Sequence, residues 1–416
     1  MSQPLERIKR YEQMGMGLFI HWGLYSLLNQ GEWTEYIHNI PKSVYEQLIQ
    51  KFSASEFKPK KLIKQAKKMG AKYIVLTTKH HEGFFLYDTL GLSHFDASHS
   101  AARRDLIREF VDACRAESII PFFYVATYDW HSPLYQTNFD AYLDYLQKSV
   151  EILCTQYGKI GGFWFDGNWN KKNADWHLSE LYGMIRKHQP DCIIINNTGL
   201  KNRGVVSNPE IDVVTYERGT PDQVNHGVSS EKYVAGEVSV TLNQHWGNAV
   251  NDLNYKSPKT ILENICHARQ IGANVLVNIG LSGNGSIPPM SRNYMTIIGQ
   301  WFSRFGEAIY DTKPATMASR TNNKDFALKS PTDSYLFFHD LEIVGNSNVV
   351  LGGEGVNPRT FINCFDPVDS IEWLDNHEPL TFIQDLKKGL LTIDVTGYPY
   401  GCDFTVRVAK LHWRHL

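Results

Sequence analysis

The sequence predicts an α/β fold, in which a (β/α)8-like TIM barrel is followed by a C-terminal β-sandwich domain. Eight short apolar runs alternate with amphipathic segments over residues 1–310, and polar residues gather where these runs end. From residue 311 to residue 416, short β-rich pieces replace the helical segments. Alternation of strands with helices is typical of a parallel sheet, and eight such units can close into a barrel.

Each apolar run in the first part is short enough for a strand that is buried on both faces. The expected strands are 17–21, 72–78, 119–125, 162–166, 193–196, 213–217, 234–240 and 274–279. Between several of them, apolar residues recur at spacings of three and four, which predicts helices over 58–69, 103–116, 139–157 and 258–271. Gly70 and Gly272 stand where two of these helices should end, and glycine adopts the left-handed conformation that closes a helix.

The last hundred residues show a different pattern, with Gly, Pro, Asn and Asp separating short β-rich pieces and with no convincing helix. Such spacing favours an antiparallel β-sandwich. The expected strands are 335–339, 347–351, 370–374, 391–395 and 404–409. We therefore expect two domains, 1–310 and 311–416.

The composition limits the classes of partner. With 42 basic and 44 acidic residues the formal net charge is -2, and no run of like charges predicts a nucleic-acid or membrane surface. The polar amino terminus and the absence of a long uncharged apolar stretch predict a cytoplasmic protein without signal peptide or membrane span. The six cysteines are widely spaced, so we expect reduced thiols and no metal or cofactor. The sequence leaves a homo-oligomer open.

Polar and aromatic residues accumulate at the carboxyl ends of the first four expected strands, where barrel enzymes build their active sites. His21 closes the first strand, and His80 and His81 follow the second. Tyr124 lies at the end of the third strand, and the fourth ends in the run Trp-Phe-Asp-Gly at 164–167. Histidine, aromatic rings and a carboxylate at one face predict a pocket that stacks on a sugar and binds its hydroxyls.

A carboxylate at the end of an apolar strand has two interpretations. Asp166 can be a nucleophile in a retaining glycosidase, which needs a second carboxyl group about 5 to 5.5 Å away as acid and base. It can also be a helix cap or a core acceptor. For the second carboxyl group, the pattern leaves Glu210, Glu217 and Glu237 open, and the unused ones are interpreted as substrate contacts or paired carboxylates.

Several motifs together resemble the α-L-fucosidases of glycoside hydrolase family 29. They are Phe-Ile-His-Trp-Gly at 19–23, Gly-Glu-Trp at 31–33, Thr-Thr-Lys-His-His-Glu-Gly-Phe at 77–84, Trp-Phe-Asp-Gly at 164–167 and Asn-Val-Leu-Val-Asn-Ile-Gly at 274–280. They occur in the family's order across most of residues 15–310. The resemblance implies a retaining exo-α-L-fucosidase that acts on fucosylated oligosaccharides or glycoconjugates.

The same resemblance assigns roles to individual residues. Asp166 is the expected nucleophile, and the segment 212–217 favours Glu217 as acid and base over Glu237, which is then counted among the substrate contacts. The arginine that often contacts the sugar has Arg203 as its candidate. Hydroxyl contacts and the walls of the pocket are assigned to His21, Glu32, Trp33, His80, His81, Tyr124 and Trp164.

Two other functions are compatible with these residues. His21, His80, His81, His131 and Asp166 could surround a metal ion in a metal-dependent TIM-barrel hydrolase. A non-catalytic carbohydrate-binding protein could use the same scaffold, because a fold does not guarantee turnover. Activity in the presence of a chelator separates the first alternative from a glycosidase, and the presence of both carboxyl groups argues against the second.

Overall fold

The computed structural model describes residues 3–227, 232–352 and 356–414. The chain divides into two compact units. The first comprises Met1–Lys256 and Asn274–Thr296, and the second comprises Ser257–Ala273 and Ile297–Leu416. A domain is a unit that can fold alone, and compactness does not test this property. The predicted division into domains 1–310 and 311–416 therefore stays a prediction.

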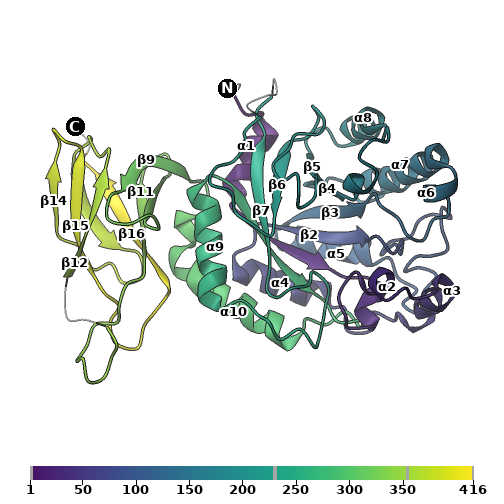
Figure 1. Ribbon diagram of the computed structural model, residues 1–416, viewed down its shortest axis with the longest axis horizontal. Coiled ribbons are helices and arrows are strands. Elements are labelled where there is room, and N and C mark those ends of the chain that lie inside the picture. Colours follow the sequence, from purple (N-terminus) through teal and green to yellow (C-terminus); the bar gives the residue numbers. More distant parts are fainter. Residues whose placement is uncertain (1–2, 228–231, 353–355, 415–416) are drawn as a thin grey trace. The chain divides into compact units, whose positions relative to one another are not determined.

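Eight parallel strands close into a barrel in the order in which they occur in the chain (Figure 1). Closure is made by β1 and β8, which pair in parallel from Met16↔Val275 to His21↔Gly280. The predicted runs 162–166 and 213–217 coincide with β4 and β6, and the other six agree within a residue or two. The strands are β1 (Met16–His21), β2 (Tyr73–Lys79), β3 (Ile120–Ala126), β4 (Gly162–Asp166), β5 (Ile193–Asn197), β6 (Val213–Glu217), β7 (Ala235–Thr241) and β8 (Asn274–Gly280).

The α-helices among the described residues confirm the four predicted helical segments and add others. α4 ends at Gly70, whose φ of 105° is left-handed, and the side chain of Asp105 caps α5 by accepting from the amide of Arg108. They are α1 (Glu6–Met14), α2 (Thr34–Ile37), α3 (Lys42–Tyr45), α4 (Pro59–Met69), α5 (Leu106–Ala116), α6 (Leu134–Thr137), α7 (Phe139–Gln156), α8 (Leu178–His188), α9 (Pro258–Gln270) and α10 (Pro289–Phe305). None of the helices in the described parts of the chain is both long and apolar enough to span a lipid bilayer.

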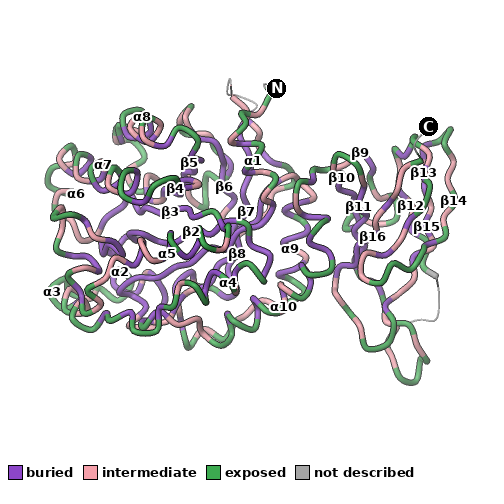
Figure 2. The backbone as a smooth tube through the Cα atoms, turned by 180° about the vertical axis from the view of Figure 1, so that it is seen from behind, coloured by how far each residue is buried: buried purple, intermediate pink, exposed green. Residues whose placement is uncertain are grey.

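The barrel interior is a packed aromatic and aliphatic core rather than a channel. Alternate residues of the strands, among them Phe19, Tyr73, Tyr124 and Trp164, form one buried cluster. α1 contributes Ile8 and Tyr11 to the same cluster. Figure 2 shows the barrel strands buried along almost their whole length, so a polar side chain becomes accessible only where a strand ends.

The carboxyl-terminal part is one antiparallel eight-stranded sheet in the order β13-β16-β11-β10-β9-β12-β15-β14. Trp373 of β13 donates through Nε1 to Oγ1 of Thr396 on β15 at 2.9 Å, although these strands are six positions apart in that order. The two halves of the sheet therefore face each other around one core, as the sandwich prediction requires. The strands are β9 (Lys313–Ser319), β10 (Phe326–Lys329), β11 (Ser334–His339), β12 (Val356–Ile362), β13 (Val368–Trp373), β14 (Phe382–Asp385), β15 (Leu390–Thr396) and β16 (Val406–Trp413).

One predicted strand of this part is wrong. Residues 347–351 form a turn and a bend instead of a strand. Their apolar side chains gain no burial, because Val349 and Leu351 are among the most exposed apolar residues of the chain. The β-branched composition of this segment therefore predicted a strand for which no pairing partner exists in the described sheet.

Candidate active site

A cavity of about 430 Å³ opens at the carboxyl ends of the barrel strands. It contains eight of the ten residues predicted for the site, which come from four strands, from the loop after β1 and from the residue that follows β2. Its walls are completed by residues that follow β4, β5 and β6 and by Trp246. The lining residues are Phe19, His21, Glu32, Trp33, His80, Tyr124, Trp164, Asp166, Trp169, Lys172, Asn197, Thr198, Gly199, Leu200, Lys201, Asn202, Glu217, Arg218 and Trp246.

Asp166, the last residue of β4, is held by donors on both carboxyl oxygens. Oδ2 accepts from the hydroxyl of Tyr124 at 2.9 Å, and Oδ1 accepts from Nε1 of Trp169 at 2.8 Å. Burial alone would raise the pKa of Asp166, but the hydrogen bond and charge of His81, helped by these donors, hold the pKa below its usual value. Asp166 is therefore ionised at neutral pH.

His81 contacts Asp166 without lining the cavity. Its Nε2 lies 3.3 Å from Oδ2 of Asp166, and its Nδ1 lies 2.9 Å from the carbonyl oxygen of Tyr128. A carbonyl oxygen only accepts, as does an ionised carboxylate, so a proton on each ring nitrogen satisfies both contacts. The structure thus gives His81 contact with the expected nucleophile rather than a place in the wall of the sugar pocket.

Glu217, the last residue of β6, lies in a different electrostatic environment. Burial raises its pKa, and the negative charge of Asp166 raises it further, while Asn197 and the arginines Arg218 and Arg203 oppose the shift. Nε of Arg218 is 3.9 Å from Oε1 of Glu217. The pKa values of Asp166 and Glu217 are thus shifted in opposite directions, which is the usual arrangement of an ionised and a protonated partner.

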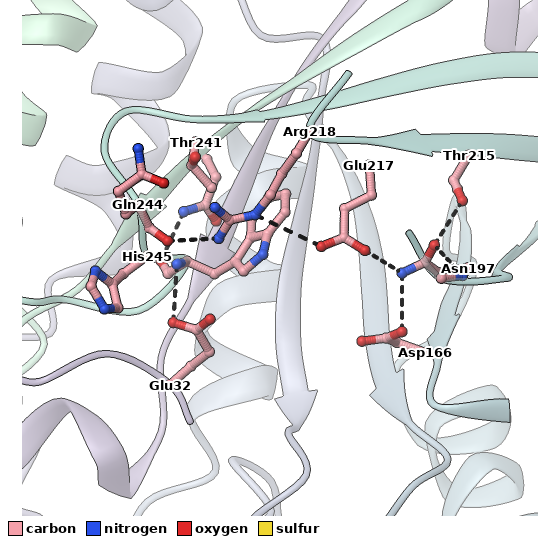
Figure 3. Close-up of polar contacts among 12 residues, drawn as sticks. Glu32, Asp166, Asn197, Thr215, Glu217, Arg218, Thr241, Gln244 and His245 are labelled. Atoms are coloured by element: carbon pink, nitrogen blue, oxygen red, sulfur yellow. Dashed lines mark hydrogen bonds and ion pairs between the residues drawn. The ribbon is translucent and has the colours of Figure 1, made fainter. Parts of the chain in front are cut away.

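Asn197, the last residue of β5, joins the two carboxyl groups (Figure 3). Its Nδ2 donates to Oδ1 of Asp166 at 3.1 Å and to Oε2 of Glu217 at 2.9 Å. The amide orientation is fixed, because Oδ1 of Asn197 accepts from the hydroxyl of Thr215 and from the amide of Gly199. Since one nitrogen bonds to both, these two carboxyl oxygens cannot be further apart than the two distances together, 6.0 Å.

Glu32 fastens the loop after β1 to the segment that follows β7. Its buried Oε2 accepts from the backbone amides of Trp246 at 3.0 Å and of Gly247 at 2.7 Å. Gly247 is needed for this approach, because a Cβ there would lie 2.9 Å from the backbone nitrogen of Glu32. The contact leaves Oε1 of Glu32 for the cavity, and the neighbouring Trp33 ring lies at the mouth beside Trp169.

His21 is a neutral acceptor. Nδ2 of Asn278 donates to the carbonyl oxygen of Trp246, so Oδ1 of Asn278 accepts from Nδ1 of His21 at 2.7 Å. Burial lowers the pKa of His21 to about 3. With its proton on Nδ1, the ring presents the lone pair of Nε2 to the cavity.

Glu237 requires a correction, since the structure gives it no contact with the cavity. It is fully buried in the barrel interior, where Oε2 accepts from the hydroxyls of Tyr11 and Tyr73, and Oε1 accepts from Nε1 of Trp164 at 2.8 Å. Both oxygens are therefore satisfied within the core. Glu237 thus contacts a wall of the pocket through Trp164 and does not itself line the cavity.

Active-site residues of a barrel lie at the carboxyl ends of its strands, and this rule also applies to cavity residues that the sequence analysis did not single out. Asn197 closes β5, and Arg218 follows β6 directly, so both could have been found by extending the rule beyond the fourth strand. Arg218 lines the cavity with its guanidinium 5.2 Å from the ring centre of Trp246, whereas the candidate Arg203 is outside the lining. Trp169 lies in a short 3-10 turn after β4, and no periodic pattern marks it.

The described residues offer no group of three or more His, Cys, Asp or Glu side chains arranged to hold a metal ion. His131 is turned to Glu46 at 2.9 Å instead of to the other histidines. Nδ1 of His21 is used by Asn278 and that of His81 by Tyr128. The donor set expected for a metal-dependent hydrolase does not converge in this part of the chain.

Comparison with known proteins identifies the family. Residues 2–307, most of the chain, match the family described as alpha-L-fucosidase. The chain belongs to the α-L-fucosidases of glycoside hydrolase family 29. This agrees with the motifs and with the arrangement of Asp166, Glu217 and the surrounding aromatic residues.

Two relatives in the family share about a quarter of their residues with this chain. The tissue alpha-L-fucosidase of Rattus norvegicus is 26% identical over 353 residues, which cover 77% of this chain and 73% of the relative. The plasma alpha-L-fucosidase of Homo sapiens is 26% identical over 397 residues, covering 83% and 81%. Alpha-L-fucosidase isoenzyme 1 from Paenibacillus thiaminolyticus is similar in structure, with a TM-score of 0.83, 29% identity and 99% of both chains covered.

A further structural neighbour bears on the fold. The alpha-L-fucosidase from Bacteroides thetaiotaomicron, trapped as a covalent intermediate with 2-fluoro-fucosyl fluoride, has a TM-score of 0.84 at 24% identity. Its alignment covers 100% of this chain and 97% of the neighbour. The barrel and the sheet domain that follows it are therefore shared over their full length.

Proposed function

We propose that the protein is a retaining exo-α-L-fucosidase, which removes terminal α-L-fucosyl residues from oligosaccharides or glycoconjugates by double displacement. The principal support is the Asn197 bridge. It brings one oxygen of Asp166 and one oxygen of Glu217 to within 6.0 Å of each other, which is compatible with the separation of about 5 to 5.5 Å between the carboxyl groups of a retaining enzyme. The opposite pKa directions of the two carboxyl groups supply the ionised and the protonated partner that a glycosidase needs.

In the first step, Asp166 attacks the anomeric carbon of the fucosyl residue while Glu217 donates its proton to the departing glycosidic oxygen. A β-linked fucosyl ester of Asp166 forms, and Glu217 becomes ionised. In the second step, Glu217 takes a proton from water, the water oxygen attacks the anomeric carbon, and the bond to Asp166 breaks. The released fucose has the α configuration of the substrate.

The cavity suits a single terminal sugar. Its volume of about 430 Å³ is at the lower end of small-molecule sites, at roughly 300–1,000 Å³. His21 offers an acceptor and Glu32 a carboxylate for hydroxyl groups. Phe19 and Trp246, whose ring centres are 5.8 Å apart, give an apolar wall for the methyl group that replaces the 6-hydroxyl of fucose.

The test uses 4-nitrophenyl α-L-fucoside with wild type, Asp166→Ala and Glu217→Ala, each with and without azide. We expect Asp166→Ala to lose activity on the order of 10⁴-fold and to form β-fucosyl azide, since azide then replaces the nucleophile. We expect Glu217→Ala to form α-fucosyl azide from the fucosyl-enzyme. The configuration of each azide is measured by proton NMR.

The same experiment separates the alternatives. A wild type that binds fucose without turnover supports a non-catalytic carbohydrate-binding protein. Loss of wild-type activity in EDTA, with recovery on adding a divalent metal, supports the metal-dependent hydrolase. If β-fucose is the first product of wild type, the enzyme is inverting, and the double-displacement mechanism is wrong.

We also propose that the enzyme works in a reducing, cytoplasmic environment on short fucosylated oligosaccharides. All six cysteines are free, and five of them are buried. Disulfides are rare in proteins of the reducing cytosol. Cell fractionation followed by an α-L-fucosidase assay tests this location, and recovery of the activity outside the cells contradicts it.

A further inference from the structure

Two buried polar groups beside the cavity, the carboxyl group of Glu82 and Nδ1 of His80, lack hydrogen bonds of normal geometry among the described residues. Glu82, three residues after β2, is 1% exposed, and neither of its carboxyl oxygens has a hydrogen-bond partner of normal geometry among the described residues. Nδ1 of His80 is also buried and without a partner in that part of the chain. Oε2 of Glu82 lies 3.7 Å from this nitrogen. Unpaired buried polar groups are rare in folded proteins, and a movement of roughly 1 Å would join these two.

The surroundings of the pair favour an uncharged carboxyl group. Burial raises the pKa of Glu82 well above its usual value, and the charge of Glu35 adds to the shift, as does that of Asp129. The nearby cation, Lys79, is already bound to Asp129 at 2.6 Å. The backbone amides of Glu82 and Leu24 oppose the shift without cancelling it.

The imidazole of His80 is also uncharged. Burial lowers its pKa well below the usual value, and its neighbours His81 and His21 lower it further. When both groups are neutral, the carboxyl group of Glu82 keeps its proton. Nδ1 of His80 then has a free lone pair that can accept a hydrogen bond from that proton. The proton of the neutral imidazole must then be on the other nitrogen, Nε2.

We propose that Glu82 is a positioning residue that donates its carboxyl proton to Nδ1 of His80, so that Nε2 of His80 is a fixed hydrogen-bond donor to a substrate oxygen. His80 is in the wall of the sugar cavity, and Nε2 is the nitrogen on the side away from Glu82. This inference rests on the proposed α-L-fucosidase function, because it assigns a role in binding the same sugar.

The proposal does not depend on where the shared proton sits between the two groups. If the proton moves from the carboxyl group to Nδ1, Nε2 still keeps its own proton and still donates. The opposite arrangement is found in His21, whose Nδ1 donates to Asn278 and whose Nε2 accepts. The cavity therefore presents two histidines with fixed and opposite hydrogen-bonding directions, which suits two sugar hydroxyls in one orientation only.

The experiment compares Glu82→Gln with Glu82→Met. The glutamine amide can donate to Nδ1 as a protonated carboxyl group does, whereas methionine has a similar length and cannot. Tyr25→Phe is the matched control, since its ring packs against His80 at 5.2 Å while the Glu82–His80 pair remains. Thermal unfolding of each variant checks that the fold is kept.

The first measurement is the tautomer of His80, observed by long-range proton–nitrogen NMR of protein labelled with ¹⁵N-histidine and assigned with His80→Gln. We expect the proton on Nε2 in wild type, in Glu82→Gln and in Tyr25→Phe. We expect a shift of the proton to Nδ1, or a mixture, in Glu82→Met. A neutral His80 with its proton on Nδ1 in wild type overturns the proposal.

The second measurement is kcat/KM on 4-nitrophenyl α-L-fucoside and on its monodeoxy analogues. Glu82→Gln should stay within about threefold of wild type, and Glu82→Met should lose about 10- to 100-fold, as expected for a mismatched hydrogen bond to a substrate hydroxyl. Glu82→Met should also cease to discriminate against one deoxy analogue that wild type rejects. Equal losses in both variants show that a hydrogen-bond donor to Nδ1 of His80 does not preserve activity, and they contradict the proposal.

Failure of the proposed function and failure of the proposed role of Glu82 give different results. If wild type has no activity on α-L-fucosides but the His80 tautomers follow the expected order, the proposed function is wrong and the role of Glu82 stands. If wild type is active and the tautomer of His80 is the same in all variants, the role of Glu82 is wrong and the function stands.

Discussion

Two glutamates on neighbouring strands, Glu217 on β6 and Glu237 on β7, show how position along a barrel strand decides what a carboxyl group can do. In the register of these strands, Ser239 pairs with Glu217, and Thr215 pairs with Glu237. Glu237 is thus two residues closer to the amino-terminal end, a difference of about 7 Å along the strand. The first residue lines the cavity, and the second lies in the core.

Burial raises the pKa of both glutamates, but their partners differ. Glu217 is close to the charge of Asp166 and shares Asn197 with it, so its protonation state is coupled to that of the proposed nucleophile. Glu237 accepts from two tyrosines and from Trp164, which lines the cavity. A raised pKa therefore marks a reactive acid only where the group also reaches the cavity.

The largest expected difference between the two is in catalysis. Glu217→Gln removes the proton donor, so kcat should fall about 10²- to 10⁴-fold on fucosides with poor leaving groups. With 4-nitrophenyl α-L-fucoside the rate of the first step should fall less, because 4-nitrophenolate departs without protonation. Glu237→Gln should stay within roughly tenfold of wild type on both substrates, because Glu237 acts only through Trp164.

Steady-state kinetics on an alkyl and an aryl α-L-fucoside provide this measurement. The predicted difference between the two glutamates is wrong if Glu237→Gln loses as much activity as Glu217→Gln and shows the same dependence on the leaving group. In that case Glu237 supplies the proton, and the core hydrogen bonds must rearrange in the working enzyme.

The contrast could be predicted from the sequence only in part. The strands followed from apolar runs, and residues at their carboxyl ends, such as Asp166 and Glu217, were found by that rule. The predicted strand 234–240 already places Glu237 three residues before its carboxyl end. Its partners in the core could not be predicted, because they come from distant segments that the pattern of one strand does not show. The loop 198–202 carries no periodic signal, so its place in the cavity wall depends on tertiary structure.

The next largest effect concerns Asn197, which donates to both Asp166 and Glu217. Asn197→Ala removes a donor to both carboxyl groups, and we expect kcat/KM to fall about 10- to 100-fold. Because Asn197 holds the pKa of Glu217 down, its loss should move the alkaline limb of the kcat/KM profile to higher pH. Thr215→Val, which removes only the donor to Oδ1 of Asn197, should change both quantities in the same direction by less. A shift of the alkaline limb to lower pH in Asn197→Ala would mean that Glu217 is not the acid that titrates there.

A smaller effect is expected on the nucleophile. Tyr124→Phe removes one of the donors that favour ionised Asp166, so the pKa of Asp166 should rise. The acid limb of kcat/KM should move to higher pH, and the activity at neutral pH should fall about three- to tenfold. Tyr87→Phe is the control, since that buried hydroxyl donates to the carbonyl of Ser149 and Tyr87 does not line the cavity. A shift of equal size in both variants would mean a general change of stability.

The smallest effect is on stability, and it concerns Glu237 alone. The folded protein raises the pKa of Glu237 above its usual value of 4.5, so the folded state binds a proton that the unfolded chain has released above that pH. The free energy of unfolding should therefore decrease as pH rises from 4.5 through the folded pKa. Glu237→Gln cannot lose this proton, so the Tm of wild type should fall relative to that of the variant by a few degrees, at about 2–4 °C per kcal/mol. Scanning calorimetry of both proteins from pH 4.5 to 8 measures this difference. A constant difference in Tm across the range would mean that Glu237 keeps one protonation state throughout, and that its three donors, rather than its proton, stabilise the wall formed by Trp164.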